Sequence, residues 1–415
     1  MDFMKDYGLN EPLVSEPDSL RNKLKVFKAG TLFSAVVALS AATLGSGVLA
    51  LPYAVSNCGI ALALIIMLVA LASFTVAYHI IIQGLILTRK NTYATLVEAL
   101  FPSSMRFILE LCIVVELFGV VCAYQSIIVD FTQSIMLEVF GVQKDFFLLL
   151  NLVVTGLLCL GSLKRQMTSL SSVTSLVILS ILYITLLVIV QTPSYVRSNP
   201  SFWSYFAFFK VDFRIFDTVT LLCFSFNSIT RLPMIFDELE KKTYSQVSRV
   251  IKASLGSCTL LFLALGGFGY VSYNYNMPEL VLDRPSEGID WPMVVGKTLF
   301  TVGLTANSVQ TLYPLRGNIE EVIMGTEFNF SSVRFWTINF ATIFLIGLVA
   351  VVFNDVVGYF KIIGGFAVIP SAILYPMFIC WACSKNRLFI VCFSFIAVVF
   401  TAFGMISVFQ TILHK

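Results

Sequence analysis

The stretch Gly45-Ser46-Gly47-Val48-Leu49-Ala50-Leu51-Pro52 lies inside the apolar run of residues 32–55, where a continuous membrane-spanning helix is expected. A second stretch, Asn227-Ser228-Ile229-Thr230-Arg231-Leu232-Pro233, lies inside the apolar run 216–236. Glycine and proline weaken helices, so neither stretch has the composition of an unbroken helix. In a bilayer such a break is tolerated only where it is buried in protein or lines a cavity. Two breaks at corresponding positions in two halves of a chain are typical of a transporter's binding site.

The composition predicts an all-α polytopic membrane protein. The chain has 415 residues, of which 58% are hydrophobic and 12% are charged, whereas a water-soluble protein carries about 25% charged residues. Its apolar residues form runs of roughly 18 to 30 residues, long enough to cross a hydrocarbon core about 30 Å thick. A β-barrel would show short alternating segments instead. The Lys and Arg residues are scattered among loops without a basic stripe, so we expect no nucleic-acid partner.

Metal, redox and enzymatic chemistry are not indicated. Nearly all of the nine cysteines lie inside apolar runs, where Cys packs as a small hydrophobic residue. Cys380 and Cys383 form a C-x-x-C without a nearby His or second pair, whereas structural zinc needs four ligands. The two histidines, His79 and His414, are far apart in the chain. We therefore expect no cofactor, no metal site and no enzyme. The chain also has no G-x-x-x-x-G-K-[ST] loop of an NTP-driven pump.

Eleven apolar runs are expected to cross the membrane, at 31–56, 60–88, 106–137, 146–162, 168–191, 214–237, 251–274, 293–315, 334–355, 358–382 and 386–411. Residues 1–30 form a polar tail before them. If this tail is cytosolic, most Lys and Arg residues fall in inner loops, as the positive-inside rule requires. The sequon at Asn329 then lies on the inner side and is expected to carry no glycan.

The spacing of the runs predicts an inverted repeat. The breaks near Ser46 and Ile229 are 183 residues apart, and the third and eighth runs start 187 residues apart. A repeat of five helices is odd in number, so the second copy is inverted across the membrane. The transmembrane domain at 31–411 would then contain repeat one at 31–191, repeat two at 214–382 and an extra helix at 386–411.

Five short motifs resemble the amino acid/auxin permease family, in order over about residues 30–411. They are Gly45 to Ala54, Leu163-Lys164-Arg165 with Leu170 and Ser171, Phe224-Ser225-Phe226 with Pro233 and Asp237-Glu238-Leu239, Tyr313-Pro314-Leu315-Arg316, and Ile363-Gly364-Gly365 with Pro370 to Pro376. The resemblance implies a LeuT-like inverted-repeat fold with eleven helices. It further implies secondary active transport of neutral or cationic amino acids, of the vacuolar or neutral amino acid transporter type, coupled to protons or sodium.

The first break is expected to bind the carboxylate of an amino acid substrate. Where a helix unwinds, the free N-terminal end presents N–H groups and a partial positive charge. We therefore assign the carboxylate to Gly45, Ser46 and Gly47, since glycine accepts backbone angles that other residues resist. The alternative role for these small residues is close helix–helix packing.

The second break is expected to bind the substrate ammonium, through free carbonyl groups around Phe226, Asn227 and Ser228. The Phe226 side chain either walls the pocket or packs in the core or against lipid. Tyr124 and Gln125, in the third run, are expected to reach the same pocket.

Arg231 is a charge inside an apolar run, which is costly and therefore usually functional or paired. Its expected partners are Asp237, Glu116 or Asp130. We expect it either in an ion pair of an inner gate or in direct contact with the substrate.

The coupling ion is expected to be a proton. Thr301, Thr305 and Ser308 share one helix face and could line the cavity or hold an ion. Sodium-coupled members of the family usually have an Asn four residues before the first glycine, and here that residue is Ala41. An Ala side chain offers no oxygen to a hard cation, which favours the proton over sodium. Sodium is the alternative coupling ion, because the matching hydroxyl in the eighth run, Thr305, is retained. Glu116 is the candidate proton carrier, because burial favours the neutral form of a carboxyl group.

An amino acid sensor with little transport is the main alternative function, but the tail of about 30 residues is short for a signalling module. We expect the lipid bilayer and an amino acid as partners, and no required protein partner. The expected location is the plasma membrane or the vacuolar or lysosomal membrane. The tail segment Asn10-Glu11-Pro12-Leu13-Val14 weakly resembles an acidic, leucine-containing sorting signal.

Overall fold

The computed structural model describes residues 30–142, 146–163, 171–198, 202–240, 242–274, 277–285, 288–324, 332–384 and 386–413. Its helices are α1 (Leu32–Thr43), η2 (Ser46–Ala50), α2 (Leu51–Cys58), α3 (Ile60–Thr88), α4 (Tyr93–Leu100), α5 (Ser103–Phe140), α6 (Phe147–Gly161), α7 (Ser171–Ser198), α8 (Phe202–Tyr205), α9 (Ile215–Phe226), α10 (Leu232–Glu238), α11 (Tyr244–Ser272), η3 (Val281–Asp283), α12 (Trp291–Met324), α13 (Ser332–Val352), α14 (Val356–Ile363), η4 (Gly364–Val368), η5 (Pro370–Leu374), α15 (Tyr375–Cys383) and α16 (Arg387–Leu413). Some predicted features lie outside the described residues, namely the tail before residue 30, Lys164, Arg165, the sequon at Asn329 and His414.

Within the described residues, seven helical segments are long and apolar enough to cross a membrane, and an eighth results if the bent pair Leu32–Thr43 and Ser46–Cys58 is one span. The helices α6 and α9 are apolar but shorter, with 15 and 12 residues. Each of the eleven predicted runs contains a helix. The prediction of a multi-pass helical membrane protein is therefore confirmed, whereas the number of crossings and the inverted repeat stay predictions.

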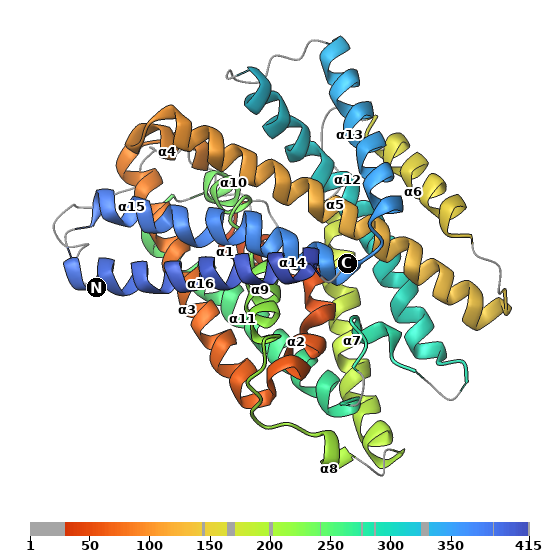
Figure 1. The fold of residues 1–415 in the computed structure, drawn as a ribbon. Coiled ribbons are helices and arrows are strands. Elements are labelled where there is room, and N and C mark those ends of the chain that lie inside the picture. Colours follow the sequence, from red (N-terminus) through yellow and green to blue (C-terminus); the bar gives the residue numbers. More distant parts are fainter. Residues whose placement is uncertain are drawn as a thin grey trace, which may run out of the picture.

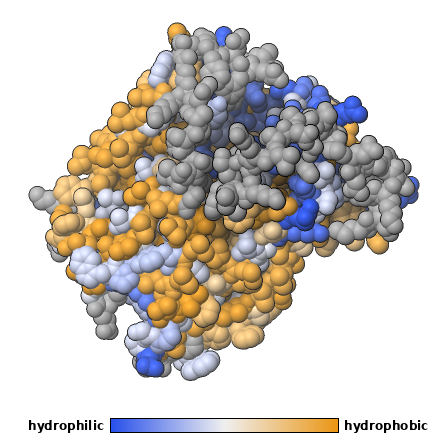
Figure 2. Space-filling view, turned by 180° about the vertical axis from the view of Figure 1, so that it is seen from behind, coloured by the Kyte–Doolittle hydropathy of each residue, from blue (hydrophilic) through white to orange (hydrophobic). Residues whose placement is uncertain are grey.

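Hydrophobic side chains cover the outside of the bundle. Figure 2 shows one face, on which hydrophobic residues predominate and hydrophilic residues gather towards opposite ends. On α6 alone, Leu148, Leu149, Leu152 and Leu160 are each more than half exposed. Apolar surface of this extent is rare on a water-soluble monomer, so these side chains are placed for contact with lipid.

The centre of the bundle is built around α5 and α12. The 38-residue helix α5 runs across the molecule and packs along α12, which also packs against α7 (Figure 1). Small residues bring the helices close together. A Cβ atom on Gly303 of α12 would lie 3.1 Å from Val177 Cγ2 of α7, and one on Gly161 of α6 would lie 2.5 Å from Val309 Cγ2 of α12. Membrane helices commonly associate through such small residues, because lipid provides little hydrophobic drive between helices.

A buried arginine fixes α12 to α6 and α13. Arg316 Nη1 donates to Asn339 Oδ1 at 2.9 Å and to Ser162 O at 3.1 Å. Asn339 Nδ2 donates in turn to Ser162 Oγ at 2.9 Å. This network satisfies a buried charge and ties three helices together, so we assign it a structural role.

The run from α14 to α15 departs from α-helical geometry in its middle, where η4 and η5 are π-helical. It is pressed between two neighbours. A Cβ atom on Gly364 would lie 2.7 Å from Thr220 O of α9, and one on Gly365 would lie 2.5 Å from Gly404 O of α16. Only glycine permits these backbone contacts. Interruptions of this kind are frequent at functional sites.

Candidate functional site

The first break separates α1 from η2 and α2. The helix α1 ends at Thr43, and Gly45 is extended, with φ −95° and ψ −165°. Pro52 lies in the first turn of α2, where its missing N–H group would have no helical partner. The axes of Leu32–Thr43 and Ser46–Cys58 differ by 54°. The sequence therefore predicts the location of this break correctly.

The two glycines of this break have different surroundings. A Cβ atom on Gly47 would lie 2.7 Å from Phe224 Cδ1 and 2.9 Å from Ser225 Oγ, so α9 can approach only a glycine here. A Cβ atom on Gly45 would lie 3.5 Å from Tyr124 Oη, an ordinary van der Waals contact. Close packing therefore accounts for Gly47, whereas Gly45 places extended backbone beside a tyrosine hydroxyl.

The second break separates α9 from α10. The helix α9 ends at Phe226, and Asn227 is extended, with φ −77° and ψ 121°. Tyr78 of α3 bridges the opened backbone. Its hydroxyl donates to Phe226 O at 3.1 Å and accepts from the Ser228 N–H at 2.7 Å. A single buried side chain thus satisfies backbone groups on both sides of the break, which is necessary where water is excluded.

The two breaks are in direct contact. Thr43 Oγ1, at the end of α1, lies 2.9 Å from Ser228 Oγ in the second break, although the two residues are 185 positions apart in the chain. The same threonine hydroxyl lies 2.9 Å from Leu39 O of its own helix. The predicted pairing of the breaks in space is therefore what the structure shows.

Asn227 joins the second break to α5. Its Nδ2 donates to Glu116 Oε1 at 2.7 Å, and its Oδ1 accepts from the Ile229 N–H at 3.3 Å. Glu116 is buried, and its second oxygen, Oε2, has no hydrogen-bond partner among the described residues. Ser371 lies nearby, but its hydroxyl donates to Val368 O.

Arg231 lies at the N-terminus of α10 and interacts electrostatically with Glu116 and Tyr124. It makes no ion pair within 4.0 Å with a carboxylate of the described residues. Of its three expected partners, Glu116 is the one it faces, whereas Asp237 pairs with Lys242. Arg231 therefore contributes a positive charge to the region between the breaks.

Tyr124 connects the first break to α12. Asn307 Nδ2 donates to the Tyr124 hydroxyl at 3.2 Å, and Asn307 Oδ1 is buried without a partner in the described part of the chain. Thr305 lies two residues before Asn307 on α12, and its hydroxyl donates to Thr301 O of its own helix. Asn307 is not among the predicted site residues. Its neighbours include Thr, Ser and Gln, so the local sequence does not distinguish it as part of a site.

Ser46 is fully buried, and its Oγ also has no hydrogen-bond partner among the described residues. Three partnerless polar atoms therefore lie next to the breaks, Ser46 Oγ, Glu116 Oε2 and Asn307 Oδ1. A buried polar atom without a partner costs about 1–3 kcal/mol. Because each lies beside one of the two breaks, these atoms are candidate contacts for a small polar ligand.

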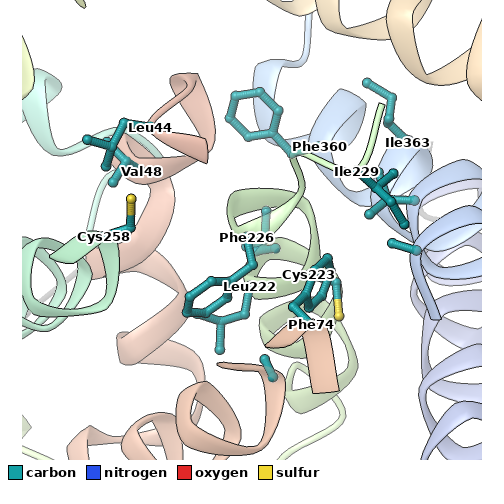
Figure 3. Close-up of a cluster of buried hydrophobic side chains, with 14 of the residues drawn as sticks. Leu44, Val48, Phe74, Leu222, Cys223, Phe226, Ile229, Cys258, Phe360 and Ile363 are labelled. Atoms are coloured by element: carbon teal, nitrogen blue, oxygen red, sulfur yellow. The ribbon is translucent and has the colours of Figure 1, made fainter. Parts of the chain in front are cut away.

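The aromatic residues at the second break differ in position. Phe226 is fully buried, with its ring centroid 6.0 Å from that of Phe74 and 5.0 Å from that of Phe262. Figure 3 shows it within an apolar cluster that also includes Leu44 from the first break and Ile229 from the second. Phe224, which we did not assign to the site, is only half-buried and lies against Gly47. Its ring stacks on Phe360 at 4.7 Å.

Gln125 does not face the breaks. Its Nε2 donates to Asn151 Oδ1 at 3.1 Å and to Thr155 Oγ1 at 3.0 Å, both on α6. Successive residues of a helix point about 100° apart, and Tyr124 points to Gly45 and Asn307 instead. Of the two residues, Tyr124 is therefore the one that lies beside a break, and its contact with a substrate stays a prediction.

A cavity of about 430 Å³ lies elsewhere, at the far end of α5, and is lined by Ser134, Glu138, Asp283, Arg284, Pro285, Gly288, Ile289 and Lys297. Lys297 Nζ donates to Glu138 Oε1 at 2.6 Å. Glu138 is 22 residues from Glu116 along one helix, a distance of about 33 Å at 1.5 Å per residue. This cavity is therefore separate from the two breaks.

Solved structures with a similar architecture are transporters. A manganese transporter of Eremococcus coleocola, in complex with an aromatic bis-isothiourea substituted compound, matches with a TM-score of 0.58 and 12% identity, over 98% of this chain and 91% of that chain. A mutant of the same transporter matches with a TM-score of 0.56 and 13% identity, over 99% and 91%. At this identity the likeness concerns the fold, which is one that membrane transporters adopt.

The chain belongs to the family described as transmembrane amino acid transporter protein, whose model matches residues 28–414. Vacuolar amino acid transporter 7 of Saccharomyces cerevisiae is 24% identical over 298 residues, which are 68% of this chain and 58% of that protein. Human solute carrier family 38 member 10 is 18% identical over 227 residues, 54% of this chain and 20% of that protein. The chain thus spans less than two thirds of either relative.

These comparisons confirm the resemblance to the amino acid/auxin permease family. The description of the family and the name of the yeast relative are those of transporters, in agreement with the prediction that the chain is not an enzyme. Among the described residues no three His, Cys, Asp or Glu side chains are grouped as metal ligands would be.

Proposed function

We propose that this chain is a secondary active transporter that carries amino acids across a membrane by alternating access around its two broken helices. One observation carries the proposal. The Thr43–Ser228 contact brings the breaks together, and the partnerless Ser46, Glu116 and Asn307 atoms lie beside them. Membership of the amino acid transporter family supports the substrate class.

The substrate carboxylate would bind at the first break. The N–H groups of Ser46 and Gly47 lie at the N-terminal end of η2, where the second half of that span begins. The first N–H groups of a helix have no helical acceptor. Together with the partial positive charge of the helix end they suit a carboxylate. The buried Ser46 hydroxyl would donate a further hydrogen bond, and Gly45 leaves room beside Tyr124.

The substrate ammonium would bind at the second break, at the C-terminal carbonyl groups of α9 around Phe226, Asn227 and Ser228. Glu116 would supply the balancing negative charge. Arg231 and Asn307 would set which side chains are accepted, since they contribute a positive charge and an unpaired amide oxygen.

Proton coupling is supported by Glu116 and by Ala41, whose side chain offers no oxygen ligand for sodium. Glu116 is a buried carboxyl group beside the substrate region, with one oxygen held by Asn227 and the other without a partner. A group in this position can bind a proton on one side of the membrane and release it on the other when access alternates. Sodium remains the alternative ion, with Thr305 among its candidate ligands.

We further propose eleven crossings in a five-plus-five inverted repeat with one added helix and a cytosolic N-terminus. The yeast relative, a vacuolar amino acid transporter by name, favours the vacuolar or lysosomal membrane over the plasma membrane. An amino acid sensor with little transport is the alternative function.

The test is uptake of a panel of labelled amino acids by proteoliposomes that contain the purified chain. We expect uptake of at least one neutral or cationic amino acid that rises with an imposed proton gradient and not with a sodium gradient. Protein-free liposomes and liposomes without a gradient are the controls. No uptake under either gradient would contradict transport, and dependence on sodium alone would contradict proton coupling.

A further inference from the structure

A buried ion pair lies where α9, α14 and α16 meet. Lys361 Nζ of α14 is 2.8 Å from Asp217 Oδ2, in the first turn of α9, and the two side chains are only 14% and 10% exposed. Ser407 of α16 donates to the other carboxylate oxygen, Asp217 Oδ1, at 2.6 Å. Charges in a membrane-spanning bundle are costly unless paired, and they usually mark a functional element.

The pair is also joined to the second half of the first broken span. Lys361 Nζ lies 5.8 Å from the centre of the Tyr53 ring of α2, within the range of a cation–π interaction. Thr218, the residue after Asp217, donates to Ala54 O of α2 at 2.9 Å. Four helices therefore converge here, and Figure 1 shows α9, α14 and α16 together at the centre of the view.

The same helices cover the candidate site. Phe224 lies seven residues after Asp217, about 10.5 Å along α9 at 1.5 Å per residue. It stacks on Phe360, the neighbour of Lys361, and lies against Gly47 of the first break. Separation of α14 from α9 would break the ion pair and the aromatic stack together and would uncover Gly47 from this end of the bundle.

We propose that Asp217, Lys361 and Ser407 form a latch that holds α2 and α9 against α14 and α16, and that opens when the substrate pathway opens at this end. Each partner lies on a different helix, so the contacts exist only while these helices stay together. The proposal rests on the proposed transport function, because a latch is needed only if access alternates.

Cys58 is a native reporter for opening. It is fully buried at the end of α2, and its thiol lies 3.6 Å from Ala54 O and next to Thr218. The experiment is alkylation of the full chain in lipid nanodiscs by a charged maleimide, with the modified peptides quantified by mass spectrometry. Removing one partner of a buried ion pair leaves the other charge uncompensated. Asp217→Asn and Lys361→Met should therefore each raise the rate of Cys58 alkylation at least about 10-fold.

Two controls separate a latch from a general loss of stability. Glu138→Gln breaks the Lys297–Glu138 pair, whose lysine side chain is only 3% exposed, and should leave the Cys58 rate unchanged. Cys122, fully buried in α5, should stay unreactive in every variant. Exchanging the charges, Asp217→Lys with Lys361→Asp, should bring the Cys58 rate back towards the wild-type value.

An unchanged Cys58 rate in both single variants would overturn the proposal. A parallel rise at Cys58 and Cys122 would also overturn it, since the pair would then stabilise the whole fold. The labelling requires no substrate, so its outcome is independent of the uptake assay that tests transport itself.

Discussion

The hydroxyl oxygens of Thr43 and Ser228 lie 2.9 Å apart, and they join the end of α1 to the break that follows α9. The contact places two interrupted helices side by side, with buried polar atoms of both breaks close to each other. A membrane protein tolerates such irregular backbone only where protein or a ligand satisfies its N–H and C=O groups. Substitutions at the breaks can separate the groups that stabilise the fold from those that bind the substrate.

Gly47→Ala should reduce uptake in proteoliposomes by at least about 10-fold, because its Cβ would lie 2.7 Å from the Phe224 ring and would push α9 away from the first break. Gly256→Ala is the matched control, since nothing lies within 4 Å of a Cβ at that position of α11. Initial rates at equal protein content measure the effect. Equal rates in the two variants would show that the close approach of α9 to Gly47 is not required.

Ser46→Ala should raise the KM for the transported amino acid about 10-fold without lowering the thermal stability of the protein. The Ser46 hydroxyl has no protein partner among the described residues, so its removal leaves no protein group unsatisfied. Ser73→Ala is the control, because the buried Ser73 hydroxyl already donates to Val69 O of its own helix. A loss of stability with an unchanged KM would assign Ser46 to the fold.

Glu116→Gln should abolish uptake driven by a proton gradient and preserve exchange of labelled for unlabelled substrate at substrate concentrations high enough to offset the lost negative charge at the ammonium. The glutamine can still accept the Asn227 hydrogen bond through its Oε1, but it cannot release and bind a proton at neutral pH. Glu98→Gln changes an exposed carboxylate on α4 and should leave both activities intact. Gradient-driven uptake by the Glu116→Gln protein would exclude Glu116 as the proton carrier.

Tyr78→Phe should lower the free energy of unfolding by about 1–3 kcal/mol, because buried backbone groups of Phe226 and Ser228 would lose their shared partner. Tyr183→Phe is the control, since the Tyr183 hydroxyl bonds to Pro292 O at an exposed position. Thermal unfolding in detergent compares the two variants with the wild type. Equal stability of the two variants would mean that water or another group replaces Tyr78 at the break.

The positions of the two breaks could be predicted because their causes are local. Glycine and proline in one run, and a polar stretch before Pro233 in the other, weaken a helix through the backbone of the residues themselves. The family resemblance rests on five short motifs, two of which lie at the breaks, and the match over residues 28–414 confirms it. Glu116 and Arg231 were conspicuous as charges in apolar runs, and the structure places both beside the second break.

The partners of the breaks could not be predicted, because they depend on contacts between distant residues. Tyr78 is one of 15 tyrosines and Phe224 one of 38 phenylalanines, and nothing in their neighbourhood distinguishes them. Tyr78 meets Ser228 across 150 positions of the chain. Asp217 and Lys361 lie near the ends of their apolar runs, where charged residues are common, so their pairing becomes visible only in three dimensions.

The most direct test of a substrate site between the breaks is a cryo-electron microscopy map of the full chain in nanodiscs, saturated with the amino acid that shows the highest uptake. We expect substrate density between Gly45-Ser46-Gly47 and Asn227-Ser228, with its carboxylate in hydrogen-bond distance of the Ser46 and Gly47 N–H groups. Density in the cavity lined by Glu138 and Lys297, with none between the breaks, would contradict it.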